Sequence, residues 1–223
     1  MELLSILFVD PFLDMADSPV FLMEVIVNGL LTGVLYSLVA LGFVLIFKAS
    51  GVFNFAQGAM VLFAALTLVG LIEHGVPVII AIFLTAVVMV ALAALIERWM
   101  LRHLVNQEGI ILFMATIGLN FILEGAGQIA WGSDVKKLSI GLPDGTVEWA
   151  GMLLSTLDLT GAAIGAVLVT FLALFFHYTT IGRALRAVAD DHQAALSVGI
   201  PLKTIWIIVW AVAGCVALVA GIM

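Results

Sequence analysis

Six long stretches of apolar residues set the strongest limit on how this chain can fold. A bilayer core about 30 Å thick requires roughly 20 apolar residues in each helix that crosses it. Of the 223 residues, 64% are hydrophobic and 10% are charged, whereas a soluble domain usually has about 25% charged residues. The sequence therefore predicts an all-α integral membrane protein, a polytopic transmembrane helix bundle with helices over residues 24–47, 55–72, 76–96, 109–130, 159–178 and 204–223.

The basic residues predict the orientation, because Lys and Arg gather in the short cytoplasmic loops of membrane proteins. With the N-terminus outside, only Lys136 and Lys137 are external, and residues 1–23 form an external N-terminal segment. Residues 24–223 then form one transmembrane domain. The sequence leaves open whether residues 48–58 are cytoplasmic or lie in the membrane. Six of the eight Lys and Arg residues are cytoplasmic in this orientation: Lys48, Arg98, Arg102, Arg183, Arg186 and Lys203.

The loop of residues 131–158 is the only long external loop in this orientation. Its Gly and Pro content predicts a packed, turn-rich cap that is too short for a domain. Small residues also recur at helical spacing inside the apolar stretches, in the pairs Gly29 and Gly33, and Gly161 and Gly165. Such pairs allow helix backbones to approach closely in lipid, so they predict helix packing.

The stretch GRALRAVADDHQAALSVGIP, residues 182–201, is unusually polar for this chain. Its spacing predicts one short helix over residues 182–200, with Gly199 in its C-terminal turn and Pro201 as its stop. Arg186 and Asp190 lie four residues apart, so we expect a weak pair on its polar face. Many alanines make the helix slim, which suits docking into a protein groove. The residues fit anchoring at the membrane interface equally well.

Polar residues also mark the start of the second apolar stretch. Asn54 and Gln57 lie here beside Phe53, Phe55 and Gly58. A polar break at the end of a membrane helix is how many transporters present backbone dipoles to a substrate. The same residues fit the simpler role of capping a helix end. Both interpretations, a translocation path and a helix cap, are open from the sequence.

Two further polar groups lie within the apolar stretches. Thr116, Asn120 and Glu124 are spaced four residues apart, so they form one stripe along a helix. Asn28 and Tyr36 share nearly one face of the first helix. Polar groups inside a membrane need a partner or a water-filled path. Hydrogen bonds between helices are the ordinary explanation, and contact with a transported solute is the functional one.

The sequence lacks the motifs of the common catalytic and metal sites. It contains no HExxH, GxSxG or GxxxxGK[ST] pattern, so we predict no catalytic residue and no metal site. The one cysteine, Cys215, excludes a disulfide framework within the chain. The net charge is −7 and no basic stripe is present, so no nucleic-acid partner is expected.

Two motifs resemble a known family. The pattern G-R-A-L-R-A-V-A-D-D-x-x-A-A-x-x-V-G-I in residues 182–200 is similar to the cytoplasmic coupling loop of ABC-transporter permeases of the branched-chain amino acid type, the LivH family. The segment FKASGVFNFAQGAM, residues 47–60, resembles the INFAHG segment of that family. The resemblance covers about residues 25–223. Members generally continue for further spans, so the chain looks C-terminally truncated relative to the family.

The resemblance implies a permease subunit of an ATP-driven importer in a bacterial inner membrane. Its solutes would be branched-chain amino acids or a related small polar solute, such as urea or a short amide. The implied partners are two ATPase subunits, a second homologous permease, an external solute-binding protein and membrane lipid. No cofactor is expected on this chain, because ATP and Mg²⁺ would bind to the ATPase subunits.

The resemblance and the polar residues together define the candidate site. For coupling to the ATPase, the residues that match the family pattern are Gly182, Arg183, Arg186, Ala187, Asp190, Ala194, Gly199 and Ile200. For the translocation path, the candidates are Phe53, Asn54, Phe55, Gln57, Gly58, Asn120 and Glu124. The alternative function is a stand-alone channel or secondary transporter, for which Glu124 is the one candidate ionisable residue deep in a span. An intramembrane enzyme ranks last, because no nucleophile and base lie at a useful spacing.

Overall fold

A computed structural model describes residues 10–51, 53–104, 107–136, 138 and 145–223. These residues form α2 (Asp10–Asp17), α3 (Pro19–Ser50), α4 (Gln57–Glu73), α5 (Val78–Trp99), η1 (Leu101–His103), α6 (Gly109–Trp131), β1 (Thr146–Trp149), β2 (Met152–Ser155), α7 (Thr156–Tyr178), α8 (Thr180–Asp190), α9 (His192–Ser197) and α10 (Leu202–Ile222). Within the described residues, five helices are long and apolar enough to cross a membrane, and α4 is a shorter apolar helix. The predicted all-α polytopic bundle is confirmed.

Helix α3 is longer than the predicted range of 24–47. Its first turn begins with Pro19, and the Ser18 hydroxyl accepts a hydrogen bond from the Phe21 N–H at 3.4 Å. At its C-terminus Gly51 has a φ of 66°, and its N–H donates to the Phe47 carbonyl at 2.9 Å. A helix of 32 residues is about 48 Å long. It therefore projects beyond a bilayer core about 30 Å thick.

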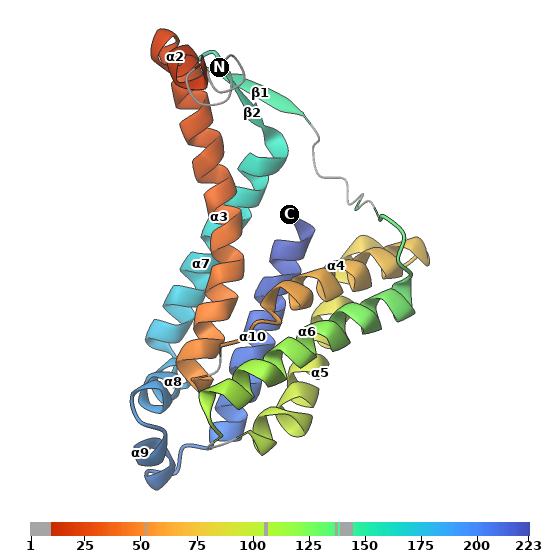
Figure 1. The fold of residues 1–223 in the computed structure, drawn as a ribbon, viewed down its shortest axis with the longest axis vertical. Coiled ribbons are helices and arrows are strands. Elements are labelled where there is room, and N and C mark those ends of the chain that lie inside the picture. The colour runs from red at the N-terminus through yellow and green to blue at the C-terminus, as the bar shows by residue number, and fades with distance from the viewer. Residues whose placement is uncertain (1–9, 52, 105–106, 137, 139–144) are drawn as a thin grey trace.

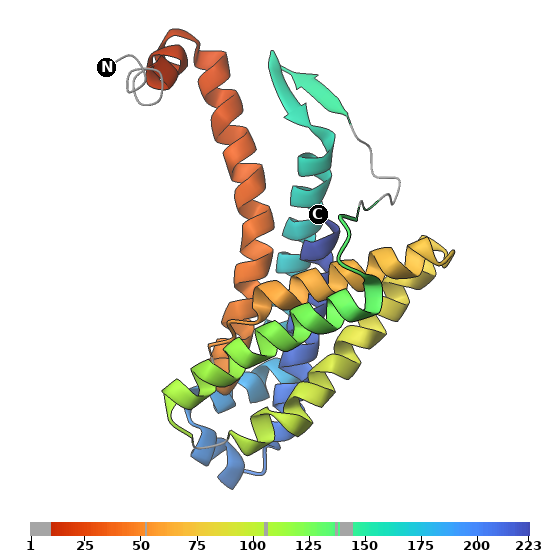
Figure 2. The same cartoon turned by 45° about the vertical axis from the view of Figure 1, so that its right-hand side comes forward.

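Helix α10 lies at the centre of the bundle (Figures 1 and 2). It packs against α3, α4 and α5, while α7 packs along α3 and α6 packs along α4. Trp206 and Trp210 belong to its buried face. Gly214 allows close contact with α5, since a Cβ there would lie 3.2 Å from the Cβ of Met89. The α3–α7 pair and the α4–α6 pair are thus joined through α10.

The two predicted small-residue pairs have different surroundings. A Cβ on Gly161 or Gly165 of α7 would lie 3.0 or 3.1 Å from a side chain of α3, so this pair brings two helices close together, as predicted. Gly29 and Gly33 have no described atom within 4 Å of the position that a Cβ would take. This second pair therefore lies on an open face of α3.

Part of the external loop forms a β-hairpin. Strands β1 and β2 are antiparallel, with Trp149 opposite Met152. Ala150 and Gly151 have φ values of 53° and 81°, and positive φ at both central residues is what a type I′ hairpin turn requires. The predicted turn is present, but the strands were not predicted, because four residues are too short for a clear alternating pattern. Residues 137 and 139–144 of this loop lie outside the described residues.

Candidate translocation and coupling site

The chain turns between α3 and α4, and the polar side chains of this turn are buried. Asn54 is fully buried and Gln57 is 3% exposed. The Asn54 Oδ1 accepts a hydrogen bond from the Ala56 N–H at 3.1 Å, and its Nδ2 donates to the Gln57 Oε1 at 3.2 Å. The Nδ2 also lies 3.5 Å from the sulfur of Met60. Asn54 therefore supplies hydrogen bonds that the chain lacks before the first turn of α4.

Gln57 lies directly against α3 at Gly42. A Cβ at Gly42 would lie 2.3 Å from the Gln57 Nε2, so the glycine provides the space that this side chain occupies. The Gln57 Nε2 is buried and has no hydrogen-bond partner among the described residues. Leaving a buried amide donor unpaired costs about 1–3 kcal/mol. The turn thus contains a donor whose hydrogen bond is not made within the described chain.

Aromatic rings cover the outer side of this turn. Phe53 and Phe55 are each 46% exposed. The ring centroids of Phe43 and Phe47 in α3 lie 4.8 and 4.7 Å from that of Phe53, and Phe113 of α6 lies 4.7 Å from Phe55. All three contacts are edge-to-face, the arrangement that aromatic pairs favour. The aromatic cluster joins α3, the turn and α6 around the buried amides.

The polar stripe of α6 reaches the turn through one residue. Thr116 is fully buried and its hydroxyl donates to the Phe53 carbonyl at 3.0 Å. Asn120 and Glu124 are half-buried further along α6, and no hydrogen bond among the described residues joins either to the buried amides. Gly58, in the first turn of α4, is exposed. The structure therefore brings together most of the candidate path residues, whereas Asn120 and Glu124 lie about one and two helical turns beyond Thr116 on α6.

Among the described residues, Asn28 and Tyr36 make no hydrogen bond to another helix, which was the ordinary explanation for this pair. The Tyr36 side chain is 72% exposed. The Asn28 Oδ1 is buried and has no partner among the described residues. The placement of α3 explains the exposure of Tyr36, because the face with Tyr36, Gly29 and Gly33 points away from the rest of the described bundle.

The predicted single helix of residues 182–200 is two helices. Helix α8 ends at Asp190 and α9 begins at His192, with Asp191 in an extended conformation (φ −155°, ψ 112°). The Asp191 carboxylate accepts hydrogen bonds from the N–H groups of Gln193 at 2.8 Å and Ala194 at 3.0 Å. An aspartate in this geometry caps a new helix, and its side chain competes with continuous helical bonding. The prediction of one helix is therefore wrong.

Helix α8 is fixed to the end of α7. Arg186 donates hydrogen bonds to the carbonyls of Phe176 at 2.8 Å and His177 at 3.4 Å. A Cβ on Gly182 would lie 1.8 Å from the Phe176 carbonyl oxygen, so glycine is required at this contact. The ion pairs of the described residues do not include Arg186 with Asp190. The predicted pair is wrong, because the guanidinium instead satisfies carbonyls left free at the C-terminus of α7.

The α8–α9 pair has one buried side and one exposed side. Leu185, Val188 and Ala195 are buried toward the bundle. The pair lies at the end of the molecule opposite the β-hairpin (Figure 1). Among the predicted coupling residues, Gly182 is buried, Ala187 and Ile200 are half-buried, and the exposed ones are Arg183, Arg186, Asp190, Ala194 and Gly199.

Sequence reasoning did not single out two buried polar side chains near this end. The Trp206 Nε1 donates to the Ala49 carbonyl at 3.1 Å, so it ties α10 to the end of α3. Glu97 is 3% exposed and lies 3.7 Å from the Arg102 guanidinium. Charged residues in the last turn of an apolar helix usually indicate a solvated end. Glu97 and Arg102 are five residues apart, whereas paired side chains on a helix are three or four apart. The sequence therefore provided no indication of their contact.

The fold defines a class of protein, a multi-pass helical membrane protein. Apolar helices surround a buried polar turn, and a capped polar helix pair lies at one end. A family profile described as "Branched-chain amino acid transport system / permease component" matches residues 25–223. The chain belongs to this family. It is a transport subunit rather than an enzyme, and permeases of this kind work with ATPase and substrate-binding partners.

Curated relatives cover most of the chain. The high-affinity branched-chain amino acid transport system permease protein LivH of Escherichia coli (strain K12) is 28% identical over 225 residues, which span 94% of this chain and 72% of the relative. The corresponding permease protein BraD of Pseudomonas aeruginosa is 26% identical over 214 residues, spanning 90% and 70%. A probable LivH protein of Methanocaldococcus jannaschii is 28% identical over 198 residues, spanning 82% and 60%. No solved structure matches the chain.

Proposed function

We propose that this permease belongs to an ATP-driven importer for branched-chain amino acids or a related small polar solute, such as urea or a short amide. The α8–α9 pair is the observation that carries the proposal. It is exposed on one side, fixed to α7 on the other, and lies at one end of a membrane bundle. The solute class comes from what the LivH and BraD relatives are named for.

Coupling follows from the way α8 is attached. An ATPase subunit that contacts Arg183 and Asp190 of α8 and Ala194 of α9 pushes on both helices. Because Gly182 and Arg186 hold α8 against the last turn of α7, the two helices move together. Helix α7 packs along α3, and α3 leads directly into the buried turn before α4. Movement of the ATPase subunits is thereby transmitted to the candidate path.

The buried turn suits a solute with an aliphatic side chain and a polar head. Phe53 and Phe55 supply an apolar wall. The unpaired Nε2 of Gln57 is a donor for a carboxylate or an amide oxygen, and the interior position strengthens such a bond. Glu124, half-buried on α6, lies about 12 Å beyond Thr116 along the helix. We therefore propose it as an acceptor for an ammonium group at a different point of the path. We assign the path to this turn, with Asn54 as the residue that holds its shape.

The remaining parts of the proposed importer lie on other chains. We propose two ATPase subunits, a second homologous permease and an external solute-binding protein, assembled in a bacterial inner membrane. This chain binds no cofactor in this proposal. ATP and Mg²⁺ bind to the ATPase subunits, which explains why this sequence needs no phosphate-binding loop.

The coupling role is tested by ATP hydrolysis of the whole importer in proteoliposomes, stimulated by the loaded binding protein. Arg183→Glu reverses an exposed charge on α8. We expect stimulated hydrolysis to fall about ten-fold with an unchanged melting temperature. The control Asp134→Lys reverses an exposed charge in the external loop and should change neither quantity. Unchanged stimulation in Arg183→Glu contradicts the coupling role, and uptake without ATP supports the stand-alone transporter.

The path is tested by the solute concentration needed for half-maximal uptake. Asn54→Leu should raise this concentration more than Asn28→Leu, because Asn54 holds Gln57 in place whereas Asn28 lies away from the turn. The melting temperature of each variant is measured in parallel. Equal effects of both variants on uptake, scaling with lost stability, count against a path at this turn.

A further inference from the structure

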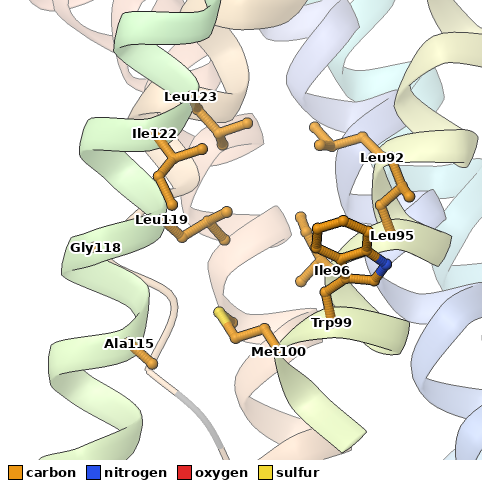
Figure 3. A pocket seen from close by; sticks show the side chains of 10 residues that line it. All are labelled: Leu92, Leu95, Ile96, Trp99, Met100, Ala115, Gly118, Leu119, Ile122 and Leu123. Atoms are coloured by element: carbon orange, nitrogen blue, oxygen red, sulfur yellow. The ribbon is translucent and has the colours of Figure 1, made fainter.

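An apolar groove lies between α5 and α6 (Figure 3). It has a volume of about 550 Å³, and both walls carry apolar side chains. Leu95 is 52% exposed and Ile122 is 67% exposed, so the groove opens to the surroundings of the bundle. Both helices are long and apolar enough to cross a membrane, so an open apolar groove between them suits contact with the hydrocarbon of the bilayer. Its lining includes Leu92, Ile96, Met100, Gly118 and Leu119.

Basic residues gather where the α5 side of this groove ends. Arg98, Arg102 and His103 line a hollow of about 430 Å³ together with Trp99. Trp99 also lines the groove, so the hollow continues it. The Arg98 guanidinium takes part in neither ion pair of the described residues. Arg102 lies 3.7 Å from the Glu97 carboxylate, which offsets part of its charge.

Along α5, an apolar stretch is followed by Trp and basic residues. A phospholipid in the cytoplasmic leaflet has its acyl chain and its headgroup in the same order. An apolar surface lies at membrane depth, and Trp99 and two arginines follow at the helix end. Trp is enriched at the level of the headgroups, and basic pockets at the cytoplasmic surface bind anionic headgroups. Arg98 and Arg102 are among the residues that the charge distribution places in the cytoplasm.

We propose that the α5–α6 groove is a binding site for an anionic glycerophospholipid of the cytoplasmic leaflet. One acyl chain lies along Leu119 and Ile122, and the headgroup phosphate accepts charge-assisted hydrogen bonds from Arg98 and Arg102. The bound lipid holds α5 and α6 together on the side where the groove separates them. This site is independent of the coupling role of α8 and α9.

Native mass spectrometry of the detergent-solubilised importer tests the site. The protein is exposed to equal amounts of phosphatidylglycerol and phosphatidylcholine with identical acyl chains. We expect phosphatidylglycerol to be retained preferentially. Arg98→Gln should lower this preference about five-fold, the effect of one basic residue near a lipid headgroup. The control Lys48→Gln removes an exposed cytoplasmic charge from α3 and should leave the preference unchanged.

A second variant tests the acyl-chain position. Gly118 lines the groove and has no described atom within 4 Å of its Cβ position, so the side chain of Gly118→Leu begins in open space and occupies part of the groove. It should lower retention of both lipids, whereas Gly29→Leu on the open face of α3 should not. Equal retention of the two lipids by the unchanged protein overturns the proposal, and so does retention that neither variant alters.

Photo-crosslinking on the unchanged protein gives a result that does not depend on variant folding. A phosphatidylglycerol with a diazirine in its acyl chain should label peptides that contain residues 92–100 and 115–123. Labelling confined to other helices overturns the site. Labelling of a partner chain in place of residues 92–100 and 115–123 also overturns it, because the lipid then lies against that chain and not in the groove.

Discussion

Two buried tryptophans, one turn apart on α10, differ in the hydrogen bonding of their indole rings. Trp206 donates from Nε1 to the Ala49 carbonyl at 3.1 Å. The Trp210 Nε1 is buried without a partner among the described residues. Both rings fill space in the core. Comparing the two positions therefore separates the effect of the hydrogen bond on stability from the effect of ring volume.

Substituting each tryptophan by phenylalanine should therefore have unequal effects on stability. Both variants lose ring volume, but only Trp206→Phe leaves a buried carbonyl without its donor. We expect Trp206→Phe to lower the free energy of unfolding by about 1 kcal/mol more than Trp210→Phe. Unfolding in mixed micelles, followed by circular dichroism, measures the difference. Equal losses would mean that the bond to Ala49 adds no net stability.

At the scale of elements, the joint between α7 and α8 depends on the absence of a side chain at Gly182. Gly182→Ala places a methyl group against the Phe176 carbonyl, which as backbone cannot rotate away. We expect the free energy of unfolding to fall by about 3 kcal/mol, the upper range for overpacking. Stimulated ATP hydrolysis should also fall, because α8 no longer packs against α7. Gly125→Ala is the matched control, since Gly125 has open space around its Cβ position among the described residues. An unaffected Gly182→Ala protein contradicts the close joint.

The division between α8 and α9 makes a separate prediction. Asp191→Ala removes the side chain that caps α9, so α9 should lose about 1 kcal/mol of local stability. Hydrogen exchange of the backbone amides from residue 193 to 197 should become about five-fold faster. The control is Asp190→Ala at the preceding residue, which is not part of the cap. It should leave these exchange rates unchanged. Equal acceleration by both variants would point to a general effect of charge.

At the scale of the whole molecule, the distribution of Lys and Arg predicts that the hairpin is external and that α9 is cytoplasmic. This is tested in a Cys215→Ala background with single cysteines at exposed serines. A membrane-impermeant maleimide added to intact spheroplasts should label Ser133→Cys. It should label Ser197→Cys only after permeabilisation. The reverse pattern contradicts the predicted orientation.

The packing of the whole bundle shows which site residues could be identified from the sequence and which could not. Asn54 and Gln57 were found because amides in an apolar chain need a partner, and the structure buries both. Gly42 was missed, since a glycine in a membrane helix has many roles and only its contact with Gln57 distinguishes it. The stop at Pro201 was predicted from local geometry, and α9 ends before it. Asp191 was not recognised as a cap because the flanking residues continue the helical pattern.

The sequence by itself determined the class of protein, the family, and the approximate ranges of the apolar helices, of which five are long enough to cross a membrane and α4 is shorter. These properties depend on hydrophobicity and motifs that are local to each stretch. Only the tertiary structure decided that α10 occupies the centre, that Arg186 bonds to α7 rather than to Asp190, and that a groove separates α5 from α6. In lipid every apolar helix has a similar exposed surface, so hydrophobicity does not select its neighbours. Packing of small residues and long-range hydrogen bonds makes that selection, and both join residues far apart in the chain.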